Sequence, residues 1–160
     1  MKRSGLKVVF LTLLVVILLV TAANIPPAFC VQNGETQYQL AKQYHNGDGK
    51  PKDRNRAFEL FTEAAEKGHK VAQFYVGVYY DLGYIFDKDL YKAAYWYNKA
   101  ADQGQMNAQY NLANLYHSGI GVTRDRKKAF FLYRSAAEQG NISAQFKVGL
   151  YFDEGYISKP

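Results

Sequence analysis

The ten residues Ala64–Gln73, AAEKGHKVAQ, recur twice in this chain at a constant spacing. The later copies are AADQGQMNAQ at Ala100–Gln109 and AAEQGNISAQ at Ala136–Gln145. All three contain two alanines, an acidic residue, a glycine and an Ala-Gln pair, and each lies 36 residues after the one before. A fixed period in this range is typical of stacked supersecondary units, so it indicates the fold class before any single residue does.

Each 36-residue unit predicts a pair of helices. In the first helix, a small residue stands between two apolar positions, as in Leu112, Ala113 and Tyr116 of the third unit. In the second and last units this position is occupied by Gly77 and Gly149. Glycine there predicts close contact with a neighbouring helix at both positions. The second helix has apolar residues at the i, i+3, i+4, i+7 and i+8 spacing of one buried helical face.

Glycines and aspartates that recur at fixed repeat positions predict the ends of these helices. Glycine adopts the left-handed conformation that often follows a helix, and an N-cap aspartate accepts hydrogen bonds from free amide groups of the first turn. The glycines are Gly47, Gly68, Gly83, Gly104, Gly119 and Gly140, and the aspartates are Asp53, Asp89 and Asp125.

The third unit, AQYNLANLYHSGIGVTRDRKKAFFLYRSAAEQGNIS, resembles the Sel1-like repeat, a relative of the tetratricopeptide repeat. Its Ala-Gln, Leu-Ala-x-x-Tyr, Gly-x-Gly-Val and Ala-Ala-Glu-x-Gly elements carry the resemblance, which extends over residues 36–160. The resemblance implies an all-α fold, an α/α solenoid of antiparallel helix pairs. We therefore expect three full helix-turn-helix repeats and a terminal half repeat, at residues 36–71, 72–107, 108–143 and 144–160.

Residues 1–23 have the features of a signal peptide: basic residues, then an apolar run, then small residues before Ala23. Cleavage after Cys30 is an alternative, and an uncleaved membrane anchor is the competing interpretation. Residues 24–35 predict a linker. The expected location is therefore periplasmic, secreted or in the cell envelope, with N-terminal membrane anchoring as the alternative.

Charge and residue chemistry argue against several function classes. The formal charge of +6 falls to +3 without residues 1–23, which carry three basic residues and no acid, so nucleic-acid binding is not expected. Cys30 is the single cysteine and has no histidine nearby in sequence, so thiol catalysis is not expected. The three histidines lack metal-ligand spacing, and no nucleophile elbow or nucleotide-binding glycine motif is present. We predict no catalytic, metal or cofactor site.

The variable positions of the first helices predict a groove for a protein or peptide partner. Asparagine can bond both peptide N–H and C=O groups, while tyrosine offers a rigid apolar ring with a polar tip. The candidate residues are Tyr75, Tyr79, Asn111, Asn114, Lys147 and Tyr151. In the alternative interpretation, the three tyrosines pack between repeats as ordinary core.

These observations predict an exported helical-repeat scaffold that binds a protein or peptide without catalysis. Two alternatives stay open. The Sel1-like resemblance implies that a β-lactam-binding or hydrolysing enzyme is one of them, although no family catalytic motif matches residues of this chain. A membrane-tethered assembly component is the other. Asn141, in Asn-Ile-Ser, fits an N-glycosylation acceptor if the protein is exported from a eukaryotic cell.

Overall fold

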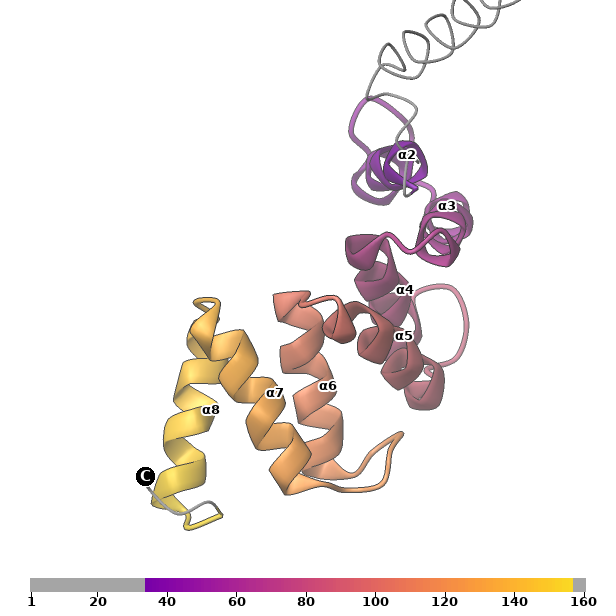
Figure 1. Cartoon of the computed structure of the whole chain (residues 1–160). Coiled ribbons are helices and arrows are strands. Elements are labelled where there is room, and N and C mark those ends of the chain that lie inside the picture. The colour runs from indigo at the N-terminus through magenta and orange to yellow at the C-terminus, as the bar shows by residue number, and fades with distance from the viewer. Residues whose placement is uncertain (1–33, 157–160) are drawn as a thin grey trace, which may run out of the picture. The chain divides into compact units, whose positions relative to one another are not determined.

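The computed structural model describes residues 34–156 of the 160-residue chain (Figure 1). The predicted signal peptide and nearly all of the predicted linker lie outside the described residues. Between residues 34 and 156, no helix has the length and apolar character needed to cross a membrane.

The described part of the chain consists of seven helices joined by short loops, with no strand among residues 34–156 (Figure 1). The all-helical architecture agrees with the sequence prediction. First helices, α2, α4, α6 and α8, alternate with second helices, α3, α5 and α7. The bounds are α2 Glu35–Asn46, α3 Arg54–Glu66, α4 Lys70–Leu82, α5 Leu90–Asp102, α6 Met106–Ser118, α7 Arg126–Glu138 and α8 Ile142–Asp153.

The predicted aspartates begin the second helices. The side chains of Asp53, Asp89 and Asp125 accept hydrogen bonds from backbone amides three residues later, at 2.9, 3.0 and 2.9 Å. These bonds satisfy amides that have no partner within the helix. At the other end of the first helices, Gly83 closes α4 with φ +64°, a conformation that side chains with a Cβ rarely adopt.

Three of the first helices, α4, α6 and α8, have side-chain caps that the sequence analysis did not predict. His69, Gln105 and Asn141 precede α4, α6 and α8, and each accepts a hydrogen bond from the amide of an alanine three residues later. The three residues differ chemically but occupy the same repeat position. Each supplies an acceptor atom, which is the property that the cap requires.

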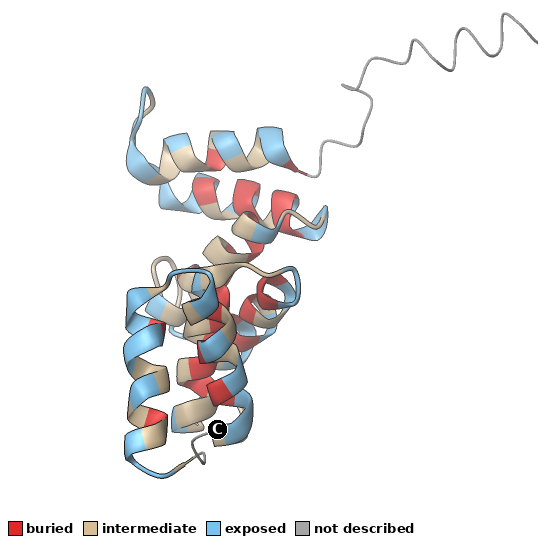
Figure 2. Cartoon of the chain, turned by 60° about the vertical axis from the view of Figure 1, so that its left-hand side comes forward, coloured by how far each residue is buried: buried red, intermediate tan, exposed pale blue. Residues whose placement is uncertain are grey.

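The core is a row of contacts between helices that are neighbours along the chain. Buried residues lie along the facing sides of adjacent helices (Figure 2). Small alanines at these contacts, such as Ala72 and Ala108, are fully buried, and they let the rings of Phe61, Tyr97 and Tyr133 fill the spaces between helices. This arrangement is the expected one for stacked repeats, in which each unit contacts only its neighbours.

The prediction of close packing at two helical glycines is right at one and wrong at the other. A Cβ added to Gly77 would lie 2.5 Å from Cδ1 of Tyr97, so α4 and α5 approach closely at this glycine. A Cβ added to Gly149 would meet nothing within 4 Å. The difference arises because α5 packs on this side of α4, whereas no described helix packs on the corresponding side of α8.

Candidate partner-binding surface

The six residues of the predicted groove fall into two groups in the structure. Tyr75, Asn111, Asn114 and Lys147 are half-buried. Tyr79 and Tyr151 are only 0% and 1% exposed, so neither ring is available to a partner. For these two tyrosines the structure matches the packing alternative, and they are removed from the candidate surface.

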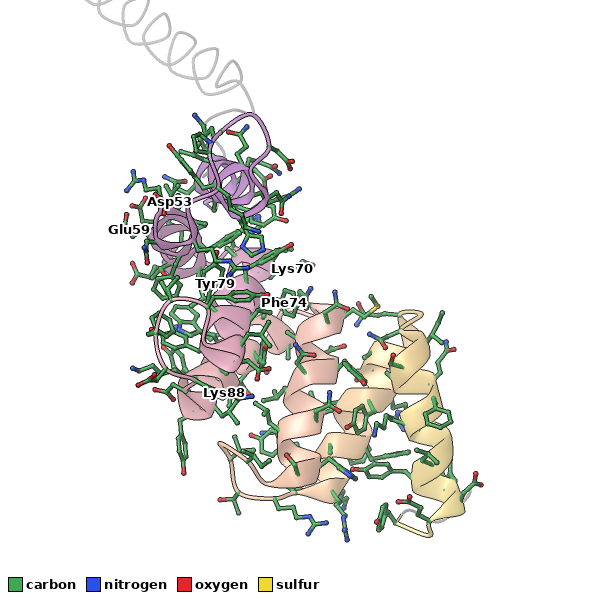
Figure 3. All side chains as sticks on the ribbon, turned by 180° about the vertical axis from the view of Figure 1, so that it is seen from behind. Asp53, Glu59, Lys70, Phe74, Tyr79 and Lys88 are labelled. Carbon is green, nitrogen blue, oxygen red and sulfur yellow. The ribbon has the colours of Figure 1, made fainter. Side chains whose placement is uncertain are left out.

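Tyr79 is buried because it points from α4 toward the first unit (Figure 3). Its ring lies 5.5 Å from Phe58 and 6.0 Å from Phe61, centroid to centroid. Its hydroxyl lies 2.8 Å from Nδ1 of His45. Burial raises the pKa of Tyr79 to about 12, so the phenol stays protonated at neutral pH.

The same pair recurs 72 residues later, where the Tyr151 hydroxyl lies 2.7 Å from Nδ1 of His117. Burial raises the pKa of Tyr151 and lowers the pKa of His117, with Lys147 adding to the latter. Burial also lowers the pKa of His45. Both histidines therefore favour the neutral form and serve as packed hydrogen-bond partners of buried phenols.

Tyr75 contributes mainly to packing. Its ring stacks on Phe61 with an interplanar angle of 2° and a centroid distance of 4.6 Å. Tyr75 is half-buried, so only part of its side chain is exposed. Tyr75 therefore stays in the candidate surface only as a partly exposed flank.

The two asparagines are held at the tips of buried tyrosines. The Tyr133 hydroxyl donates to Oδ1 of Asn114 at 2.6 Å. The Tyr97 hydroxyl donates to Asp81 at 3.1 Å. Burial raises the pKa of Tyr97, and the negative charge of Asp81 raises it further. A side-chain hydrogen bond with Asn111 acts in the opposite direction and lowers this pKa. Two core tyrosines thus fix the side chains of two neighbouring first helices.

We call Asp81, Asn111, Asn114 and Lys147 the amide face. Asp81 was not a candidate in the sequence analysis, nor were the tyrosines that orient the asparagines. The recurrence of tyrosine at residues 97 and 133, in the register of the repeat, was the signal that could have identified them. Because Oδ1 of Asn114 is occupied by Tyr133, its amide N–H groups remain the part that a ligand can meet.

A histidine–carboxylate pair on α2 and α4 has a structural role. Nε2 of His69 lies 2.9 Å from Oε2 of Glu35, while Nδ1 accepts from the amide of Ala72 as the cap of α4. Both ring nitrogens are therefore occupied. Across residues 34–156, no three His, Cys, Asp or Glu side chains are grouped so as to hold a metal ion.

The comparisons with known proteins agree with this architecture. The Sel1 repeat family model matches residues 34–69, 70–105, 107–141 and 142–159. This chain belongs to the Sel1 repeat family. Sel1 repeat domains are helical scaffolds that typically mediate protein–protein interactions and are generally without catalysis.

Solved structures that resemble this Sel1 repeat protein include the three that follow. A Sel1 repeat protein from Oxalobacter formigenes is 37% identical, with a TM-score of 0.68, over 72% of this chain and 87% of that one. A protective antigen of uropathogenic Escherichia coli strains, with an SLR fold, is 37% identical, with a TM-score of 0.71, over 76% of this chain but only 26% of that one.

The third structure, cysteine rich protein B from Helicobacter pylori, is 22% identical, with a TM-score of 0.60, over 71% of this chain and 88% of that one. At that identity the likeness supports the fold alone. No curated protein matches the chain.

Proposed function

We propose that this Sel1 repeat protein is an exported, non-catalytic scaffold that binds an extended segment of another protein at the amide face. The family supplies the general expectation, since Sel1 domains typically mediate protein interactions. The observation that carries the proposal is that the hydroxyl of the buried Tyr133 holds Oδ1 of Asn114 at 2.6 Å. In the same way, the Tyr97 hydroxyl forms hydrogen bonds with the side chains of Asp81 and Asn111.

Side chains that are already ordered lose less rotamer freedom when a ligand binds. An extended peptide presents N–H and C=O groups that no internal structure satisfies. Because Oδ1 of Asn114 already accepts from Tyr133, the amide N–H groups of Asn114 are the ones that can donate to a peptide C=O group. Lys147, on α8, adds a positive charge that acts on His117 of α6, the helix that carries both asparagines. We therefore expect the ligand to be a peptide backbone in an extended conformation, with an acidic group toward α8.

Selection from a displayed peptide library, followed by fluorescence anisotropy on the full chain, tests this proposal. The double variant Asn111→Ala/Asn114→Ala is expected to bind a selected peptide at least about tenfold more weakly, because two oriented amides are lost. The matched control is Asn55→Ala, which removes an exposed asparagine from α3. Equal affinity for the double variant and the unaltered chain would contradict the amide face as the binding surface.

Export is a separate part of the proposal and rests on residues 1–23. Cell fractionation and N-terminal sequencing of the mature protein test it. A new N-terminus after Ala23 or Cys30 supports cleavage and export. An intact N-terminus in the membrane fraction supports the tethered alternative, and an intact N-terminus in the cytoplasm argues against export.

A further inference from the structure

The outward sides of the second helices carry different residues at the same repeat positions. Position 59 on α3 holds a glutamate, while the equivalent positions 95 on α5 and 131 on α7 hold Tyr95 and Phe131. Glu59 points outward from α3 (Figure 3). The helix pair therefore forms with a charged residue at this position, and packing does not require the aromatic rings found in the later units.

The rings on α5 and α7 are exposed to solvent. Tyr91 and Tyr95 are 78% and 54% exposed, and Phe131 is 44% exposed. Ile120, in the loop between α6 and α7, is 55% exposed and lines the same open groove as Tyr91. A group of large exposed apolar side chains on neighbouring elements marks an interaction surface more often than scattered single residues do.

Cations accompany these rings. Nζ of Lys99 lies 4.7 Å from the ring centroid of Tyr95, and Cζ of Arg134 lies 5.3 Å from that of Phe131. At the Lys99 position, α3 instead has the acidic Glu63. The pairing of a ring with a cation thus occurs on α5 and again on α7.

The exposed charge is mainly positive on this side of α5 and α7. Lys127 is also exposed on α7, whereas Lys92 of α5 pairs with the N-cap Asp89 at 3.3 Å. The acidic residues stand at the ends of the two helices, Asp89 and Asp102 for α5 and Asp125 and Glu138 for α7. Glu138 lies 3.5 Å from Arg134 in an exposed pair, which water screens strongly. Leu132 of α7 packs against the core cluster that α5 forms with α6, so both second helices border the same cluster.

We propose that this surface, which we call the ring-and-cation surface, docks on an anionic phospholipid bilayer. It consists of Tyr91, Tyr95, Lys99, Lys127, Phe131 and Arg134. Tyrosine and tryptophan rings favour the boundary between headgroups and acyl chains, and basic side chains are attracted to anionic headgroups. This binding activity goes beyond the proposed function and uses a surface on other helices than the amide face.

The exposure of the rings favours a bilayer over an acidic protein as the occupant. The rings stand out from the outward sides of two helices, and the grooves beside them are open. A headgroup layer accommodates protruding rings without preformed sockets, whereas an acidic protein would pair with the cations and leave the phenyl ring of Phe131 without an apolar environment. The combination of rings and cations therefore matches the layered chemistry of a membrane surface.

Trp96 provides a reporter for the test, since it is the single tryptophan of the chain and lies beneath Lys99, whose Nζ is 5.0 Å from its ring. The full chain would be mixed with phosphatidylcholine vesicles that contain or lack phosphatidylglycerol, with and without brominated acyl chains. We expect brominated anionic vesicles to quench Trp96 and to shift its emission to shorter wavelength. Neutral vesicles and high salt should weaken both effects.

Residues 1–23 combine basic residues with an apolar run and are expected to bind vesicles on their own, so sedimentation of the chain with vesicles is not sufficient support. Quenching of Trp96 requires α5 itself to reach the bilayer. Anchored protein whose Trp96 is not quenched by brominated lipid would overturn the proposal. So would an emission response to a polyglutamate peptide in place of the vesicles, because an acidic protein surface would then be the preferred partner.

The variant Tyr95→Glu/Phe131→Glu gives α5 and α7 the glutamate that α3 has at the equivalent position 59. It is expected to weaken vesicle binding by about tenfold or more. Tyr95 is next to Trp96, so its substitution can change the tryptophan emission directly. A second variant, Lys127→Gln/Arg134→Gln, changes only α7 and should also reduce quenching if the surface contacts the bilayer. Glu59→Gln is the matched control on α3 and should leave quenching unchanged. Undiminished quenching in both folded double variants would contradict the assignment of this surface.

Discussion

At the scale of single residues, Gly77 and Gly149 occupy one repeat position in opposite surroundings. Replacing Gly77 with alanine would push a methyl group into the buried Tyr97 ring, with the new carbon 2.5 Å from Cδ1. We expect Gly77→Ala to lower the free energy of unfolding by about 1–3 kcal/mol, because overpacking exceeds the gain in helix propensity. Urea denaturation followed by circular dichroism measures the change.

Gly149→Ala is the matched variant, since a Cβ there meets nothing within 4 Å. It should raise the free energy of unfolding by up to about 1 kcal/mol through helix propensity alone. Destabilisation of similar size by both substitutions would show that the position, and not the neighbouring Tyr97 ring, determines the effect.

The two histidine–tyrosine pairs, each with a buried tyrosine and a half-buried histidine, predict a pH dependence of stability. Burial is the main cause that lowers the pKa values of His45 and His117 from 6.5. Below that value the unfolded chain binds protons that the folded chain resists, so the free energy of unfolding should fall as pH decreases from about 6.5 toward the lower folded pKa values. Above about 6.5 both states carry neutral rings and the contribution is constant.

Thermal unfolding across this pH range measures the effect. The variant His45→Gln/His117→Gln keeps a hydrogen-bonding group near each phenol and removes the titrating ring. Its midpoint should therefore change less between pH 7 and about pH 5 than that of the unaltered chain. An identical pH profile for both proteins would assign the dependence to other groups.

At the scale of helices, the aspartate N-caps are expected to contribute to the free energy of unfolding. In Asp89→Ala, α5 would lose the acceptor that Lys92 N–H reaches at 3.0 Å. The expected loss is about 1 kcal/mol of the free energy of unfolding. Asp87→Ala, which removes an exposed carboxylate from the same loop, is the control and should have a smaller effect. Equal losses would indicate that loop charge matters more than capping.

The same scale shows which features can be predicted from sequence. The 36-residue register predicts all seven described helices and the Asp caps, because backbone geometry and apolar spacing repeat in every unit. The caps at residues 69, 105 and 141 were not predicted, because three different residue types, His, Gln and Asn, supply the acceptor atom at this position.

The candidate surface was only partly predictable, for a physical reason. Helical periodicity shows which residues share a face, but the burial of Tyr79 depends on the first unit packing against that part of α4. Asn114, one unit away, remains half-buried and is oriented by Tyr133 from another helix. Contacts between units therefore decide which members of a variable face can meet a ligand.

At the scale of the whole repeat stack, glutamines connect successive units. Gln103 donates to Gln73 at 2.7 Å, and Gln139 donates to Gln109 at the same distance. Gln73 and Gln109, both nearly buried, in turn donate to backbone carbonyls of the preceding unit. Buried amides must be bonded to avoid a large desolvation penalty, so each unit needs its neighbour for complete hydrogen bonding.

This nearest-neighbour connection predicts that a core defect has a graded effect along the chain. Leu112 of α6 is 1% exposed, and Leu112→Ala should cost about 2–5 kcal/mol locally. Hydrogen exchange should then show the largest loss of protection in α5, α6 and α7, with a smaller loss in α2 and α3, because the coupling between distant units passes through the contacts of each intervening pair.

Val76→Ala in α4, also at a fully buried position, is the matched variant for the first half of the stack. It should shift the greatest loss of protection toward α3 and α4. If either substitution lowered protection equally in all described helices, the stack would unfold as one cooperative unit, and the contacts between units would have to be strong relative to the stability of each unit. A graded response would instead allow the amide face to open or order locally when a partner binds, since α6 and α8 could change without the unfolding of α2 and α3.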